Sequence, residues 1–279
     1  MDHTGERQLA GKTFCINILT MKYPLNLLFF CAGFVGYCQA QTDSSDYFLN
    51  KLRAGTITDI ERTRLKAFAY DIQNRGQILD ESKHDYAGSL TLVNKAIIIF
   101  NALNDTLSEA NNRKFKGYLL GRFNKFSEGK AEIEQAINLF SLKKADWGVA
   151  VSRFDLSRLF EFENKVDSAL FYCNLVMNYW KGKRNTGRIF LTQNMMINLL
   201  TKLKRFDEAR ALQAESGKMA EDPQEHWQGL LDFYVVSEHL FKAAKEPTSA
   251  KLYQELYANK VLALKNEGIT ASSYFKENK

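Results

Sequence analysis

The chain has 279 residues, of which 45 % are hydrophobic and 25 % charged, a composition that excludes a disordered chain and suits one large domain or a short repeat array. Its formal charge of +6 arises from 38 basic and 32 acidic residues. Because these residues are interleaved and no basic run has the length of a nucleic-acid patch, the charge predicts a solvated surface and no nucleic-acid partner.

Helix is the secondary structure that the sequence favours. The chain holds only 3 prolines. It shows no sustained alternation of apolar and polar residues and no Asn-Gly hairpin turn, so the signals of a strand protein are missing. We therefore expect an all-α chain.

Residues 22–40 have the pattern of a secretory signal peptide. Lys22 gives a basic start, residues 25–37 form an apolar core, and residues 38–40 end the segment with a small-x-small cleavage site. The apolar run is shorter than the roughly 20 residues that a membrane-spanning helix needs. We therefore expect an exported protein, periplasmic or secreted, with an N-terminal segment over residues 1–40, one helical domain over residues 41–279 and no membrane span in the mature chain.

Two alternatives at the N-terminus stay open. Met21 stands directly before the signal pattern, and translation from this residue would make residues 1–20 a start-site artefact. Lipidation of Cys38 would make the protein a lipoprotein, although the bulky Tyr37 before it fits that processing poorly.

Several positions recur at a constant spacing of 40 residues. We call each set of equivalent positions a column. The column that marks the entry into the second helix of each pair is Tyr86, Phe126, Val166 and Phe206. Three positions later comes a column of small residues, Ser89, Gly129, Ala169 and Ala209, and seven positions beyond that the column Ala96, Ala136, Val176 and Ser216. A fourth column, in the first helices, is Leu120, Phe160 and Leu200. A fixed period indicates a repeat architecture, and small residues let two helices cross closely.

The stretch 150–177 shows one repeat unit in full. Apolar residues three and four apart place a stripe on each of two helices, residues 164–167 form the turn, and Asp167 is the expected N-cap of the second helix. A fifth pair follows, with helices that begin at Pro223 and Pro247, because proline is tolerated in the first turn. The sequence therefore predicts an α-solenoid of about five antiparallel helical hairpins.

The third and fourth units resemble the tetratricopeptide repeat (TPR). The resemblance covers about residues 59–266, with a period of 40 instead of the family's roughly 34 and without the family's tryptophan at the start of each unit. The residues that carry it are Leu156, Ser157, Phe160, Val166, Ala169 and Cys173, and then Leu200 followed by Phe206, Asp207, Glu208 and Ala209.

The resemblance implies that the first helix of each unit lines a concave groove and that outward side chains there meet a peptide. These positions are Lys114, Tyr118 and Arg122; Phe154, Arg158 and Phe162; Asn194, Asn198 and Lys202; and, in the fifth unit, His239 and Lys242. The set is basic, amide-bearing and aromatic, with few acids beyond Glu161. It therefore suits another protein or an extended peptide that carries carboxylates.

Enzyme motifs are missing from the sequence. It contains no His-Glu-x-x-His pair, no glycine-rich phosphate loop and no Gly-x-Ser-x-Gly elbow. Once the N-terminal segment is removed, Cys173 is the cysteine that remains, so it forms neither an internal disulfide nor a metal site and is expected to be a small core residue. We expect a non-enzymatic scaffold or adaptor of the cell envelope that binds a protein or peptide, without cofactor or metal.

Two other functions remain open. TPR-like arrays behind a signal peptide resemble the sensor portions of bacterial two-component kinases and transcription regulators, so a stand-alone sensor module is the first alternative. A small-ligand receptor or an enzyme that uses the groove is the second.

Overall fold

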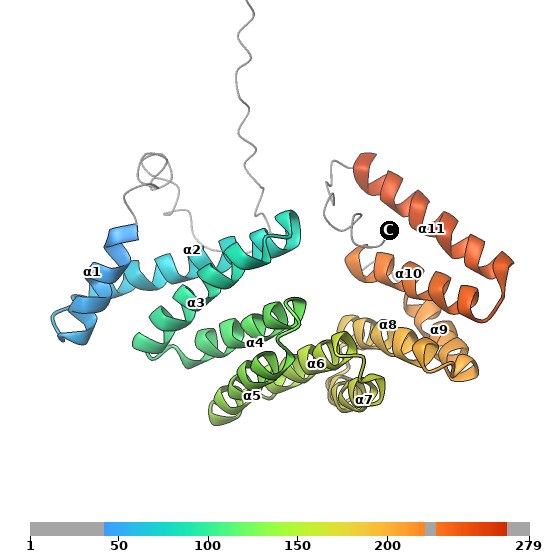
Figure 1. The fold of residues 1–279 in the computed structure, drawn as a ribbon, viewed down its shortest axis with the longest axis horizontal. Coiled ribbons are helices and arrows are strands. Elements are labelled where there is room, and N and C mark those ends of the chain that lie inside the picture. Colours follow the sequence, from blue (N-terminus) through green and yellow to red (C-terminus); the bar gives the residue numbers. More distant parts are fainter. Residues whose placement is uncertain (1–41, 221–226, 267–279) are drawn as a thin grey trace, which may run out of the picture. The chain divides into compact units, whose positions relative to one another are not determined.

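The computed structural model of the protein describes residues 42–220 and 227–266, which form eleven α-helices and no strand (Figure 1). The expected signal peptide and Pro223 lie outside these residues. The helices are α1 Thr42–Arg53, α2 Asp59–Lys83, α3 Tyr86–Ala102, α4 Thr106–Arg122, α5 Phe126–Leu142, α6 Asp146–Phe162, α7 Val166–Lys183, α8 Thr186–Lys202, α9 Phe206–Ala220, α10 Trp227–Ala243 and α11 Pro247–Asn266.

Five helical hairpins follow the first helix, as the sequence predicts. They pair α2 with α3, α4 with α5, α6 with α7, α8 with α9, and α10 with α11, and neighbouring hairpins pack against each other in chain order. The first helices of adjacent units also touch, α4 with α6 and α8 with α10. The helix α1 precedes the predicted array, and its Leu49 packs in one cluster with Leu65 and Ala69 of α2.

The helices advance in steps of 20 residues, half the period seen in the sequence. From α3 to α9 they begin at residues 86, 106, 126, 146, 166, 186 and 206, and most are 17 residues long. The turns between them are therefore only two or three residues long. The extra length over a TPR unit therefore lies in the helices.

A residue in the left-handed conformation ends most of these helices. At the end of α3, the backbone N–H of Asn104 donates to the carbonyl of Asn101 at 3.0 Å, and that of Asp105 donates to Phe100 at 2.9 Å. This pair of bonds is the Schellman motif, which satisfies carbonyls that the helix end leaves open. Left-handed residues recur along the array at His84, Asn104, Asn124, Lys144, Asn164, Arg184, Lys204 and Lys245.

The predicted columns lie where the helices meet. The four entry residues are the first residues of α3, α5, α7 and α9. All eight small or β-branched residues of the next two columns are buried. At the crossing of α4 and α5 a Cβ on Gly117 would lie 2.6 Å from the carbonyl oxygen of Gly129, so only glycine permits this approach.

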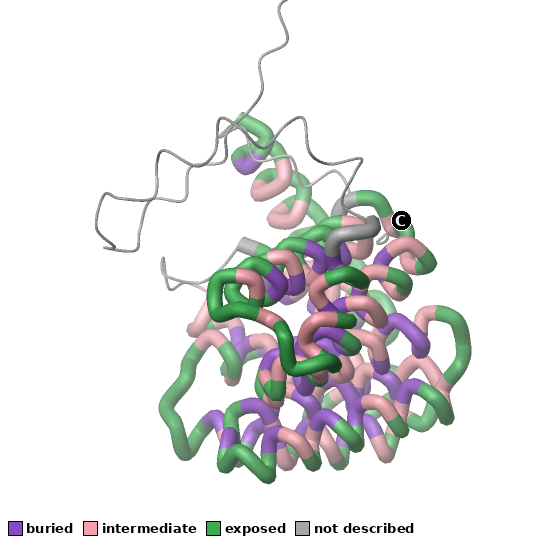
Figure 2. Tube along the Cα trace, turned by 90° about the vertical axis from the view of Figure 1, so that its left-hand side faces the viewer, coloured by how far each residue is buried: buried purple, intermediate pink, exposed green. Residues whose placement is uncertain are grey.

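The apolar interior consists of clusters that follow the array. One joins α7, α8, α9 and α10 through Cys173, Ile197, Ala209 and Leu240, and another joins α5 to α6 through Ile133, Leu156 and Leu159. Figure 2 shows buried segments recurring along successive helices. No described helix is both long enough and apolar enough to cross a membrane.

The predicted cap at Asp167 is wrong. The N-cap of α7 is Lys165, which makes no side-chain cap bond, and Asp167 lies inside the first turn. The reason is the preceding turn, because the Schellman bond from the Lys165 N–H to the carbonyl of Phe160, at 2.8 Å, fixes where the next helix begins.

Candidate functional site

The predicted groove residues of the second and third units come together on adjacent helices. Arg158 of α6 lies over the ring of Tyr118 of α4, with 4.1 Å from the guanidinium carbon to the ring centroid. The Tyr118 ring lies 6.0 Å from that of Phe162. Arg122 of α4 lies 5.7 Å from the Phe162 ring, so arginines and aromatic rings alternate.

This row extends to the first unit through a residue that was not among the predicted set. Arg122 lies 4.8 Å from the ring centroid of Tyr86, at the start of α3, and donates a hydrogen bond to its hydroxyl. We call Tyr86, Tyr118, Arg122, Arg158 and Phe162 the arginine–aromatic row. Cation–π contacts of this kind hold the planar groups in fixed orientation, so the row presents a preformed surface.

Two carboxylates pair with basic side chains on this face. Asp155 pairs with Lys114 at 3.2 Å and with Arg158 at 3.6 Å. Glu161 accepts from Lys202 at 2.6 Å and from Asn198 at 2.5 Å. Asp155 is a further acid beside Glu161 on this face, and it joins α4 to α6.

The same charges set the protonation of Arg158. Burial would lower the pKa of this guanidinium, but Tyr118 and the carboxylates of Asp155 and Asp80 act in the opposite direction and hold it above its ordinary value. Like other arginines, Arg158 is a cation at every physiological pH.

Other predicted positions lie apart from the row. Asn194 does not face outward: it is 3 % exposed and donates to the carbonyl of Gly229 on α10 at 2.9 Å. Phe154 packs partly buried against the cluster of Ala150, Val176 and Trp180. On α10, His239 is exposed, and Lys242 pairs with Glu238 at 2.7 Å.

The described part of the chain holds neither a metal-binding group of side chains nor a reactive thiol. No group of three or more His, Cys, Asp or Glu side chains there is arranged to hold a metal ion. Cys173 is fully buried, and burial raises the pKa of its thiol to about 12, as expected for a core residue.

A hollow of about 460 Å³ lies between α9, α10 and α11 and was not predicted from the sequence. Its lining includes Gln213, Phe233, Tyr234 and Tyr253. The Gln213 amide donates to the Tyr253 hydroxyl at 2.6 Å, which fixes one wall. Because residues from three different helices line this hollow, no local sequence motif indicates it.

Comparisons with known proteins identify the fold. No protein-family model matches the sequence, and no curated protein sequence matches it. Among solved structures, the chain is similar to BtubC (BKLC) from P. vanneervenii, with a TM-score of 0.60 and 15 % identity over 81 % of this chain and 92 % of that one. The fold is a TPR-like α-solenoid.

Two further structures agree with this assignment. Both are of a putative kinesin light chain from Podosopora anserina with nearly identical TPR-like repeats. One of them, a point variant of that protein, has a TM-score of 0.54 at 11 % identity over 74 % of this chain and 97 % of that chain. The other has a TM-score of 0.53 at 10 % identity over 74 % of this chain and 98 % of that chain. At such identities the likeness concerns the fold, and a helical-repeat solenoid is a scaffold suited to protein interaction.

Proposed function

We propose that the solenoid is a scaffold or adaptor that holds an extended segment of a partner protein on the face formed by α4, α6 and α8. The observation that supports this most directly is the arginine–aromatic row. Its planar groups come from separate units and are held at 4.1 to 6.0 Å by one another. Rigid aromatic and arginine side chains provide much of the binding energy at protein interfaces because they lose little conformational entropy.

The balance of charge on this face favours an acidic partner. Four basic side chains, Lys114, Arg122, Arg158 and Lys202, lie with the carboxylates of Asp155 and Glu161, and Asp80 also acts on Arg158, so basic groups outnumber acidic ones on this face. A partner segment with carboxylates spaced along it would bind to these basic side chains. Asn198 can also contribute an amide beside Glu161.

The place of action that we propose is the cell envelope or the medium. This rests on the signal-peptide pattern of residues 22–40. N-terminal sequencing of the protein from its own cells tests it, with a first residue directly after Ala40 as the expected result. A mature chain that begins at Met1 or Met21 would contradict export by this signal.

The binding face is tested by charge reversal. The variant Arg122→Glu with Arg158→Glu, expressed in the native cells, should lose the proteins that the unchanged chain retains after chemical crosslinking and mass spectrometry. The matched control is Arg62→Glu with Arg64→Glu, which makes the same substitution at two exposed positions of α2, and should retain them. Equal yields from the two variants, both with the circular dichroism of the unchanged chain, would contradict the proposed face.

A further inference from the structure

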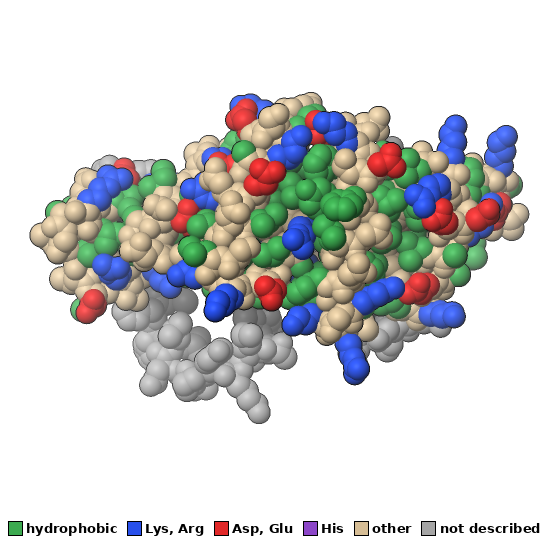
Figure 3. All heavy atoms as spheres, turned by 90° about the horizontal axis from the view of Figure 1, so that it is seen from below, with side chains coloured by type: hydrophobic (Ala, Val, Ile, Leu, Met, Phe, Trp, Pro, Cys, Tyr) green, Lys and Arg blue, Asp and Glu red, His purple; other side chains and the backbone are tan. Residues whose placement is uncertain are grey.

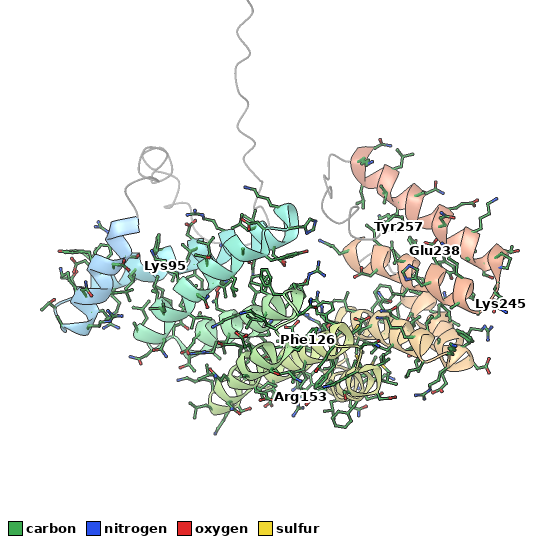
Figure 4. All side chains as sticks on the ribbon, viewed as in Figure 1. Lys95, Phe126, Arg153, Glu238, Lys245 and Tyr257 are labelled. Atoms are coloured by element: carbon green, nitrogen blue, oxygen red, sulfur yellow. The ribbon has the colours of Figure 1, made fainter. Side chains whose placement is uncertain are left out.

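The opposite side of α6 carries an arginine whose surroundings differ from those of its repeat equivalent. Arg153 lies 40 residues after Arg113, and both are the eighth residue of their helix. In Figure 4 it lies at the lower side of the molecule, where α5, α6 and α7 meet. The repeat therefore provides an internal reference for what this position requires.

Arg113 is fully paired within the chain. Its guanidinium contacts Glu109 one turn earlier on α4 at 2.8 Å, Glu132 on α5 at 2.9 Å, and the amide oxygen of Gln135 at 2.8 Å. Lys116 also pairs with Glu132, at 2.7 Å. A bidentate and charge-assisted arrangement of this kind is the geometry that guanidinium prefers.

The next unit keeps the arginine and replaces its partners. Forty residues after Glu109, Glu132, Gln135 and Lys116 stand Val149, Tyr172, Leu175 and Leu156. Arg153 makes no ion pair, hydrogen bond or cation–π contact with any residue that the structure describes, although it is partly exposed. In the following unit the position is Gln193, a buried neutral amide that accepts from Ser216 at 2.9 Å.

Apolar and aromatic residues therefore stand where the preceding unit has the partners of its arginine. Tyr172 stacks on Phe160 at 5.4 Å and packs against the cluster of Ile133, Leu156 and Leu159. Phe171, next to it on α7, is 58 % exposed. Figure 3 shows hydrophobic side chains gathered around a basic side chain over the middle of this face. Exposed apolar patches of this sort mark interaction surfaces.

We infer that the seam between α5 and α7 is a second binding surface, which takes a partner segment with one carboxylate flanked by apolar side chains. The carboxylate occupies, at Arg153, the place that Glu109 and Glu132 occupy at Arg113. The flanking apolar side chains contact Val149, Tyr172 and Leu175. This inference is independent of the binding face proposed above, because the two surfaces lie on opposite sides of α6.

Selection from a displayed library of random 12-residue peptides on the full chain tests the inference. We expect enriched peptides that carry Glu or Asp between apolar residues. By calorimetry, their synthetic forms should bind about tenfold or more weakly to Arg153→Gln, and weaken equally when the peptide carboxylate is replaced by its amide. Lys143→Gln, which removes an exposed charge elsewhere, should bind them unchanged.

A second variant keeps the test decisive. Val149→Glu rebuilds beside Arg153 one of the acids of the preceding unit, and in a protein with the circular dichroism of the unchanged chain it should abolish peptide binding although Arg153 is still present. Enrichment without an acid, or binding that survives Arg153→Gln, would overturn the inference. Peptides that are lost only with Arg122→Glu and Arg158→Glu belong to the other face, and a selection that yields only these would also overturn it.

Discussion

Arg158 lies 4.1 Å above the ring of Tyr118, and the two residues come from the first helices of successive hairpins. Their contact joins α4 to α6 directly, beside the ion pair of Lys114 with Asp155 at 3.2 Å. The same side chains that we assign to partner binding therefore also hold two repeat units in register.

A double-mutant cycle measures this contact. Tyr118→Leu and Arg158→Met should each lower the free energy of unfolding, with a coupling energy of about 0.5–2 kcal/mol between them in urea titrations. The control is the pair of Tyr179 and Lys183 within α7, where the Lys183 Nζ lies 5.8 Å from the Tyr179 ring centroid. This pair should have a coupling energy of less than about 0.5 kcal/mol. Equal coupling in both pairs would show that the row adds no rigidity.

The glycine at the α4–α5 crossing gives a prediction about packing. Gly117→Ala places a methyl group 2.4 Å from the Ile133 side chain and 2.6 Å from the Gly129 carbonyl oxygen, and backbone cannot move aside cheaply. We expect a loss of about 1–3 kcal/mol in the free energy of unfolding. Gly182→Ala, in α7 with nothing within 4 Å, should instead gain up to about 1 kcal/mol.

In the left-handed turns, we expect that replacing a residue by glycine stabilises the protein. Lys204 has a φ of 58°, a conformation in which a Cβ is strained. Lys204→Gly should therefore raise the free energy of unfolding by about 0.5–1 kcal/mol, whereas Ala211→Gly, exposed inside α9, should lower it by about 1 kcal/mol. A destabilised Lys204→Gly protein would mean that the lysine side chain has an unseen role in the turn.

The junction of α1 with α2 is sensitive to acid. A hydrogen bond from Lys51, at 2.5 Å, and one from the backbone N–H of Thr58, at 2.9 Å, lower the pKa of Glu61 to about 2 from an ordinary value of 4.5. Because the folded pKa is the lower one, the stabilisation is complete above about pH 4.5 and is lost as the pH falls towards 2.

NMR titration of the Glu61 carboxyl carbon checks this directly. The protection factors of the α1 amides against exchange should fall over the same pH range in the unchanged chain, and should be low throughout in Glu61→Gln. A Glu61 midpoint near 4.5 would show that Lys51 does not hold the carboxylate in solution.

The sequence was informative where close packing restricts residue size. Ser89, Gly129, Ala169 and Ala209 gave the helix register correctly because a larger side chain cannot enter a crossing. The shorter step of 20 residues also has a sequence signal, because bulky residues mark it at Phe100, Phe140 and Trp180 as well as at the predicted Leu120, Phe160 and Leu200. These residues stand at the same distance from each left-handed turn.

The binding face was less predictable because its contacts join distant parts of the chain. The resemblance to TPR units placed Tyr118, Arg158 and Phe162 on one side, and in the structure Tyr118 lies next to both Arg158 and Phe162. Spacing along one helix cannot show that Asp155 pairs with Lys114 from a neighbouring unit. Nor could it show that Asn194 is turned inward to a carbonyl of α10.

The division of the interior into clusters along the array has a consequence for how the molecule melts. Each helix packs on helices close to it in sequence, so no single central core must break for a part to open. Cooperativity is then transmitted from one hairpin to the next, and the terminal hairpins, with a neighbour on one side only, should unravel before the middle of the array. A partner bound across α4, α6 and α8 would couple three hairpins into one melting unit.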